Sequence, residues 1–269
     1  MPKNELRIGL IGLGQVCAAV HHPGLSRIPG VKIVGLCETD EMLLARRRKE
    51  WGIKAGYTDV DEFLKTVKPD AVTVSVPNVY HHDLVLKVIE AGCHVLCEKP
   101  LAMNAAEAEK LIATRDKTGL LVQEAFVIRH HPQWRRVREL VQGGRIGTLK
   151  AAQGWLSYRL EDSGSFRNKP EMGGGGLLDI GVYPMVTSRY IFANEPTRVF
   201  AAVRRNAETS VDCLVSTILD FPAGQAGFTW YFPSKHWIAV HSCLLFQQQT
   251  SKLRKQVDQQ SQLTTPEFE

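Results

Sequence analysis

The chain has 269 residues, which is long for one open-sheet domain and enough for two, and its 44% apolar and 23% charged residues are typical of a globular protein. The net charge is only +5, and the basic clusters at residues 46–49 and 135–138 lie on amphipathic helical stretches without interleaved aromatic residues. This pattern argues against a nucleic-acid-binding protein, and no apolar run approaches the ~18 residues of a membrane span.

The cysteines and histidines show no pattern of a disulfide framework or a metal site. Four of the six cysteines, Cys17, Cys37, Cys93 and Cys97, lie in or beside predicted buried elements of a chain whose start does not read as a signal peptide. We therefore expect reduced core cysteines in a cytoplasmic protein. The nine histidines include three adjacent pairs, but none has the spacing of a zinc motif, so we predict no metal.

The first predicted element is a buried strand, Leu6–Ile11, which leads into a glycine turn and then a helix. Glycines let the backbone turn sharply and approach a ligand, and the amides at a helix N-terminus attract a pyrophosphate. The stretch matches the dinucleotide fingerprint except that Cys17 replaces its third glycine. An ordinary glycine turn is the alternative. The predicted cofactor contacts here are Gly12, Gly14, Gln15 and Val16.

A carboxylate follows the second predicted strand, Val31–Leu36, at the position where dinucleotide-binding proteins hold the adenosine ribose. Glu38 stands 21 residues after Cys17 and can accept hydrogen bonds from both ribose hydroxyls, whereas it would repel a 2′-phosphate. We therefore predict NAD as the cofactor, with NADP possible. The alternative is that Glu38 or Asp40 only caps the helix Glu41–Trp51.

Strands and helices then alternate, which predicts a doubly wound parallel sheet, that is, a Rossmann domain over residues 1–126. Ligands bind at the carboxyl ends of such strands, which adds Pro77, Asn78, His81, Glu98, Lys99 and Pro100 to the predicted cofactor site. The remaining elements predicted here are a helix from Asp59 through Lys65, strand Asp70–Val76, helix His81–Ala91, strand His94–Cys97, helix Ala105–Lys117 and strand Leu120–Phe126.

From Val127 the pattern changes to one helix followed by longer strands, which predicts a second α+β domain over residues 127–246 with a largely antiparallel open sheet. A helix begins after the glycine run at 173–176 and extends to Phe192. The apolar patch Trp237–Phe246 and a polar tail, 247–269, follow, and we expect the tail to be disordered. The other predicted elements are helix Pro132–Gln142 and strands Thr148–Tyr158, Thr197–Arg204, Val211–Asp220 and Gln225–Tyr231.

Taken together, the motifs resemble the Gfo/Idh/MocA family of nicotinamide-dependent oxidoreductases over residues 5 to about 228. With tyrosine at 183, the chain is similar to the branch of glucose-fructose oxidoreductase, D-xylose dehydrogenase and dihydrodiol dehydrogenase. The motifs that carry the resemblance are Gly12-Leu13-Gly14, Pro77-Asn78 with His81, Glu98-Lys99-Pro100-Leu101, Phe126 with Arg129 and Pro132, and residues 174–183.

The resemblance implies that Lys99, Asp179 and Tyr183 form the catalytic site and that the open second sheet forms a dimer face. The chain after about Phe228 departs from the family, whose members continue through several more strands. We therefore expect an incomplete second sheet and a weakened homo-oligomer. Candidate substrate contacts are Tyr80, His81, Arg159, Arg167 and Asn168.

The expected activity is hydride transfer between a nicotinamide cofactor and a sugar-like or cyclic secondary alcohol or ketone. A tyrosine, with an ordinary pKa of ~10, is a poor base near pH 7 unless a cation favours its phenolate. Lys99 is the expected cation, and Asp179 lies four residues before Tyr183 on the same helical face. The alternative is a catalytically impaired nucleotide-binding protein that acts as a redox sensor or regulator.

Overall fold

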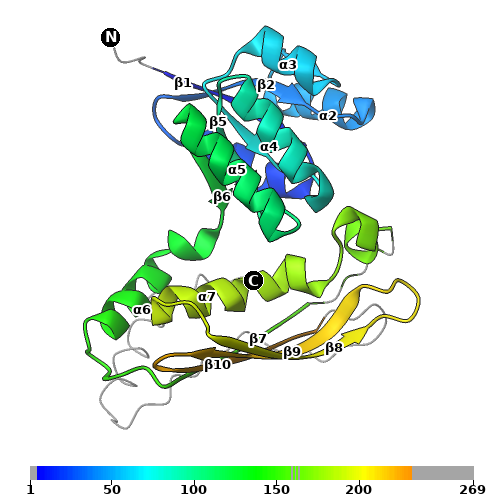
Figure 1. Ribbon diagram of the computed structural model, residues 1–269. Coiled ribbons are helices and arrows are strands. Elements are labelled where there is room, and N and C mark those ends of the chain that lie inside the picture. Colours follow the sequence, from blue (N-terminus) through cyan, green and yellow to red (C-terminus); the bar gives the residue numbers. More distant parts are fainter. Residues whose placement is uncertain (1–4, 159, 161, 163, 232–269) are drawn as a thin grey trace, which may run out of the picture.

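The computed structural model describes residues 5–158, 160, 162 and 164–231, in two domains that are stacked on one another (Figure 1). The first is built on a six-stranded parallel sheet with the strand order β3-β2-β1-β4-β5-β6. This is the order of a dinucleotide-binding sheet, so the predicted Rossmann fold is confirmed. Its strands are β1 (Leu6–Ile11), β2 (Val31–Cys37), β3 (Gly56–Tyr57), β4 (Ala71–Val74), β5 (His94–Glu98) and β6 (Val122–Ala125).

Three helices of this domain, α2 (Glu41–Trp51), α3 (Val60–Val67) and α5 (Ala105–Thr118), begin at side chains that cap them. Asp59 accepts a hydrogen bond from the Glu62 amide, and Asn104 accepts one from the Glu107 amide, so each satisfies a free N–H of the first turn. The other helices are α1 (His22–Leu25), which continues a π-helical turn at Cys17–His21, and α4 (His81–Glu90). The two-residue strand β3 was not predicted, because so short a strand leaves no hydrophobic period.

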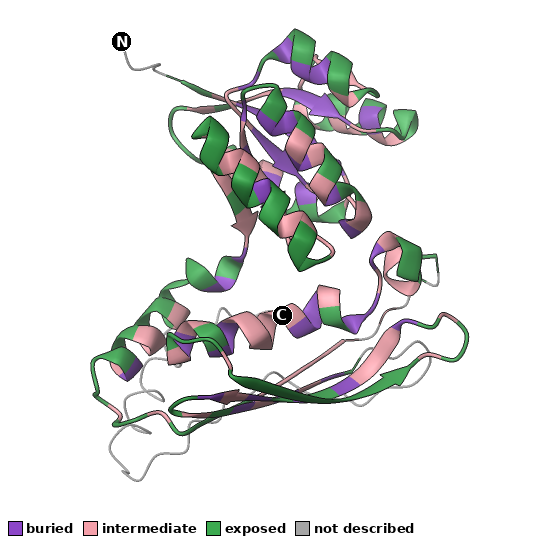
Figure 2. Cartoon of the chain, in the orientation of Figure 1, coloured by how far each residue is buried: buried purple, intermediate pink, exposed green. Residues whose placement is uncertain are grey.

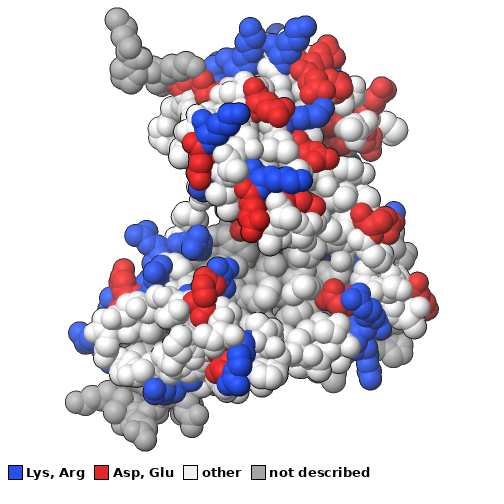
Figure 3. All heavy atoms as spheres, in the orientation of Figure 1, with Lys and Arg blue, Asp and Glu red and all other residues white. Residues whose placement is uncertain are grey.

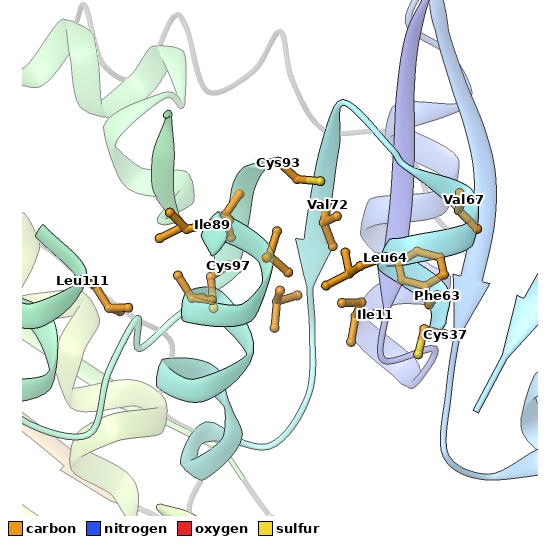
Figure 4. Close-up of a cluster of buried hydrophobic side chains, with 14 residues drawn as sticks. Ile11, Cys37, Phe63, Leu64, Val67, Val72, Ile89, Cys93, Cys97 and Leu111 are labelled. Atoms are coloured by element: carbon orange, nitrogen blue, oxygen red, sulfur yellow. The ribbon is translucent and has the colours of Figure 1, made fainter. Parts of the chain in front are cut away.

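Alternate residues of the central strand enter two separate cores, which shows that helices cover both faces of the sheet. Ile8 and Leu10 pack with Leu36 and Leu44 on one face. Ile11 points to the other face, where Phe63 and its neighbours fill the space under α3 and α4 (Figure 4). This burial on both faces explains the near-continuous apolar runs of the strands.

The second domain packs its helices on one face of a four-stranded sheet with the order β7-β10-β9-β8 (Figure 1). The β10–β9 and β8–β9 pairs are antiparallel and the β10–β7 pair is parallel, so the sheet is mixed but largely antiparallel, as predicted. The elements are α6 (Pro132–Gln142), β7 (Ala151–Ser157), a π-helical turn (Leu177–Gly181) that continues into α7 (Val182–Phe192), β8 (Arg198–Arg205), β9 (Asp212–Phe221) and β10 (Gly224–Tyr231).

The two faces of this sheet differ in their burial (Figure 2). Phe228 and Trp230 pack under the helices together with Ile191. Phe200 and Ile218, which are paired on the opposite face, are exposed. The predicted apolar patch Trp237–Phe246 and polar tail lie outside the described residues. Within the described ranges, no helix has the length and apolar character needed to cross a membrane.

Candidate functional site

The glycine turn after β1 is shaped by its neighbour strand. Gly12 has φ +80°, and a Cβ there would collide with the Ser75 carbonyl oxygen just after β4. Only glycine fits this conformation and this space. Gly14 lies in the open, since a Cβ there would have no protein atom within 4 Å. The turn therefore leaves free backbone surface beside a helix N-terminus, which fits the pyrophosphate of a dinucleotide.

Cys17 fills the place of the third fingerprint glycine as a core residue. It is fully buried and belongs to the cluster of Leu10 and Leu13. Burial raises the pKa of its thiol to about 11, against the weaker effect of a Ser75 hydrogen bond. The departure from the fingerprint is thus absorbed by packing. Gln15 and Val16, the two residues before it, are exposed beside the turn.

The two acidic residues after β2, Glu38 and Asp40, have different hydrogen-bond partners. Asp40 is the cap of α2, accepting hydrogen bonds from the Met42 and Leu43 amides. Glu38 instead accepts a 2.8 Å hydrogen bond from the amide of Leu13, inside the glycine turn. Its carboxylate is therefore fixed where the turn and the tip of β2 meet.

The loops after β4 and β5 are joined by His81. Its ring is fully buried, with Nδ1 2.6 Å from the Pro100 carbonyl oxygen and Nε2 2.9 Å from that of Val76. His81 thus holds the two loops together at the carboxyl edge of the sheet. Asn78 is also buried, and its amide donates a 2.8 Å hydrogen bond to the Gly173 carbonyl in the second domain. Pro77 precedes it at the start of this loop.

Glu98, at the end of β5, pairs with a histidine that the sequence analysis did not select. His21 Nε2 lies 2.8 Å from Glu98 Oε1, and His21 comes from the helical turn that follows the glycine loop. Only 7% of its side chain is exposed. The pair joins the glycine loop to the Glu98-Lys99-Pro100 turn, and only the fold brings these segments together.

Lys99 of the first domain contacts Asp179 and Tyr183 of the second. On the face drawn in Figure 3 the surface is hollowed between the two domains. Lys99 Nζ donates to the Asp179 carbonyl oxygen at 2.6 Å and to its Oδ1 at 3.0 Å. The same ammonium lies 5.4 Å from the centroid of the Tyr183 ring, which also packs on Phe126 at 5.2 Å. The lysine therefore comes from the first domain and the other two residues from one helix of the second.

Asp179 is held by more groups than Lys99 alone. The Tyr158 hydroxyl donates to Asp179 Oδ2, and Arg167 Nε lies 3.1 Å from the same oxygen. Burial pushes the Asp179 pKa upward, but the charges of Lys99 and Arg167 and the hydrogen bonds outweigh it, so that this pKa lies below its usual value. Asp179 is thus a fixed anion. Tyr158 was missed because its position just after β7 carries no local signal.

The electrostatics of Tyr183 correct one expectation from the sequence. We expected the Lys99 ammonium to favour its phenolate, but burial, together with the charges of Glu98 and Asp179, raises the Tyr183 pKa to about 12. Burial is the largest of these causes. The Lys99 ammonium, which we expected to oppose it, donates its hydrogen bonds to Asp179. Without bound ligands Tyr183 is a neutral phenol, that is, a proton donor.

The remaining substrate candidates are dispersed. Tyr80 is 49% exposed, and its hydroxyl lies 3.9 Å from Met172 Sδ. The Asn168 side chain donates to the Asp162 carbonyl at 3.2 Å. Arg159 lies outside the described residues. The described part of the chain contains no cluster of three or more His, Cys, Asp or Glu side chains that could hold a metal ion.

Comparisons with known proteins give matches over both domains. Residues 6–126 match the family model for the oxidoreductase family with an NAD-binding Rossmann fold, and residues 134–241 match the GFO/IDH/MocA C-terminal domain. The chain is 31% identical to dTDP-3,4-didehydro-2,6-dideoxy-alpha-D-glucose 3-reductase of Streptomyces antibioticus, covering 83% of this chain and 68% of that protein. It is 32% identical to D-glucoside 3-dehydrogenase of Escherichia coli, covering 71% and 55%.

A solved structure shares the fold of both domains. The 3-ketoreductase of Actinomadura kijaniata, in complex with NADP and TDP-benzene, superimposes with a TM-score of 0.79 at 28% identity, covering 87% of this chain and 71% of that one. The chain spans 68% of the length of the Streptomyces antibioticus reductase and 55% of that of the Escherichia coli dehydrogenase.

Proposed function

The chain belongs to the Gfo/Idh/MocA family of oxidoreductases, and on that premise we propose that it interconverts a secondary alcohol and a ketone on a sugar-like or cyclic substrate. When bound, a nicotinamide cofactor supplies or accepts the hydride and, in its oxidised form, adds a positive charge to the site. The observation that carries this proposal is the meeting of Lys99, Asp179 and Tyr183, which are contributed by two domains.

Tyr183 is the proposed proton-transfer residue. Its raised pKa keeps the hydroxyl protonated at neutral pH, so the ligand-free site is prepared to protonate the oxygen of a ketone. In the oxidising direction the same hydroxyl must first lose its proton. Oxidation should therefore become faster as the pH rises, whereas reduction should depend little on pH in the neutral range.

Lys99 and Asp179 have supporting roles in this proposal. The Lys99 ammonium offsets the carboxylate of Asp179 and donates hydrogen bonds, which suits it to hold the substrate oxygen near Tyr183. Asp179 is already engaged by Lys99, Tyr158 and Arg167, so it orients the lysine and does not act as a free base.

The proposed cofactor is NAD in preference to NADP. Glu38 places a carboxylate at the ribose end of the turn, and a 2′-phosphate there would be repelled. Arg47 of α2 donates to the Leu13 carbonyl at 3.2 Å and pairs with Glu50 at 2.6 Å, so it is already committed. We expect fluorescence titration to give tighter binding of NAD than of NADP, and Glu38→Ser to reduce this preference. Tighter binding of NADP to the wild type would contradict the assignment.

Turnover of a panel of aldoses, polyols, cyclic diols and the corresponding ketones, with both cofactors and in both directions, tests the proposed activity. Cofactor binding without turnover of any of them would favour the alternative of a redox sensor. The intact arrangement of Lys99, Asp179 and Tyr183 supports the enzyme. The free cysteines among the described residues support a reducing, cytoplasmic location.

A homo-oligomer built through the open sheet face is also part of the proposal. Phe200 of β8 and Ile218 of β9 are paired across the two strands and expose 55% and 45% of their surface on this face, which therefore carries adjacent exposed apolar side chains. We expect light scattering of the full chain to give a multiple of the 30.0 kDa monomer mass, and Phe200→Lys to shift it toward the monomer. A wild-type chain that is monomeric at all concentrations would contradict this.

A further inference from the structure

The side chains of Asp212 in β9 and Trp230 in β10 lie against glycines on either side of Asp179. A Cβ on Gly175, which has φ +110°, would collide with the Asp212 carboxylate. A Cβ on Gly176 would lie 2.7 Å from Trp230 Cδ1, and one on Gly181 would lie 2.9 Å from Trp230 Cζ2. The absence of side chains here therefore lets the helical turn that carries Asp179 rest directly on β9 and β10.

Asp212 accepts the hydrogen bonds that fix the start of this turn. Its Oδ2 accepts one from the Leu177 amide at 2.7 Å and one from Trp230 Nε1 at 3.3 Å. Gly176, the residue at the helix N-terminus, has no side chain to cap it. Asp212 thus supplies from another element the acceptor that a capping side chain gives, and its negative charge lies at the positive end of the helix.

Trp230 also packs against the helical turn, at Gly176 and Gly181. Its indole is 2% exposed, and it packs against Phe228 at 5.9 Å between ring centroids. Because the ring lies beneath both Gly176 and Gly181, the turn between them has little freedom to move toward the sheet. Asp179 lies within this turn and accepts hydrogen bonds from Lys99 through its carbonyl oxygen and its Oδ1.

We propose that Asp212 is a positioning residue for the reaction, because it fixes the turn that brings Asp179 to Lys99 and Tyr183 into the cleft. This inference rests on the proposed oxidoreductase function. Asp212 does not touch the reacting groups. It acts through the helix that carries two of them, and Trp230 holds both the turn and the Asp212 carboxylate in place.

Two variants of Asp212 separate positioning from a general effect of substitution. Asp212→Ala removes the acceptor and leaves the Leu177 amide without its partner, so we expect kcat per folded molecule to fall by about 10²-fold, as for a small misplacement of catalytic groups. KM and the dissociation constant of NAD should hardly change, because the glycine turn lies in the other domain. Asp212→Asn keeps an oxygen that can accept both hydrogen bonds and should restore most of kcat.

Asp220→Ala is the matched control, since this carboxylate lies on the same strand but accepts from Arg198 at 2.8 Å and Gln225 at 3.2 Å, away from the helix. It should leave kcat unchanged. A normal kcat in folded Asp212→Ala would overturn the inference. So would a fall of kcat in Asp212→Asn and Asp220→Ala that is as large as the fall in Asp212→Ala.

A structural measurement keeps this inference separate from the proposed function. Crystal structures of the cofactor-free wild type and Asp212→Ala should show a longer separation between Lys99 Nζ and Asp179 Oδ1 in the variant than the 3.0 Å of the intact site. An unchanged separation would overturn the inference, even if no substrate is found. A wild type that turns over none of the panel would contradict the proposed function alone.

Discussion

Replacing Tyr183 by phenylalanine should lower turnover by about 10²- to 10⁴-fold, which is the usual contribution of a positioned proton-transfer group, or ~3 to 5 kcal/mol of barrier. The substitution removes only the hydroxyl and keeps the ring that packs on Phe126 and under the Lys99 ammonium. Among the described residues, that hydroxyl forms no hydrogen bond, so folding should be hardly affected. Steady-state kinetics under conditions where the chemical step limits the rate measure the effect.

NAD affinity is the internal control for this variant, because the glycine turn and Glu38 lie away from Tyr183. It should remain at the wild-type value in the same fluorescence titration. Near-full turnover in Tyr183→Phe would show that another group transfers the proton. His81 and the pair at 130 and 131 are the remaining histidine candidates, but His81 already bridges two carbonyl oxygens and His131 caps α6.

The pH dependence of the wild type follows from the direction of the Tyr183 shift. Its pKa is raised from the ordinary value of 10.0 to about 12, so the phenolate fraction in the cofactor-free protein is very small at neutral pH. At neutral pH the phenol is protonated in both the folded and the unfolded chain, so Tyr183 does not make stability depend on pH there. As the pH rises from 10.0 to about 12, the unfolded chain loses this proton first, and the free energy of unfolding falls.

The first domain could be predicted almost completely from the sequence because each of its signals is local. The helix α2 begins and ends where its acidic cap and glycine place it, and Gly12 marks a turn that no other residue can adopt. The parallel order follows from the alternation of strands and helices. The parallel β7–β10 pair could not be predicted in this way, since α7, β8 and β9 lie between these two strands in the sequence.

The candidate site was predictable only where a motif carries it. Lys99, Asp179 and Tyr183 lie in recognisable stretches, but Tyr158, His21 and Asp212 became visible only as spatial partners of Asp179, Glu98 and Leu177. Each is an ordinary residue of a strand or helix in the sequence. The same is true of the Tyr183 pKa, because the direction of its shift depends first on the burial of this side chain and then on the nearby carboxylates of Glu98 and Asp179, which only the fold brings together.

Lys99→Met should reduce turnover by a factor comparable to that of Tyr183→Phe, since both residues belong to one proton-transfer unit. Methionine keeps much of the apolar stem but removes the ammonium that binds Asp179. Asp179 would then act on Tyr183 without its main neutralising partner, so the Tyr183 pKa should rise further and the alkaline limb of the pH–rate profile should move to higher pH.

The double variant decides whether the two residues act together. If they do, Lys99→Met combined with Tyr183→Phe should lose little more than either single variant, because the second substitution removes a function that is already lost. Lys87→Met is the matched control, since Lys87 is a surface lysine paired with Asp61 at 2.6 Å and far from the cleft. Losses that multiply in the double variant would show that Lys99 contributes independently of Tyr183, for example by binding the substrate alone.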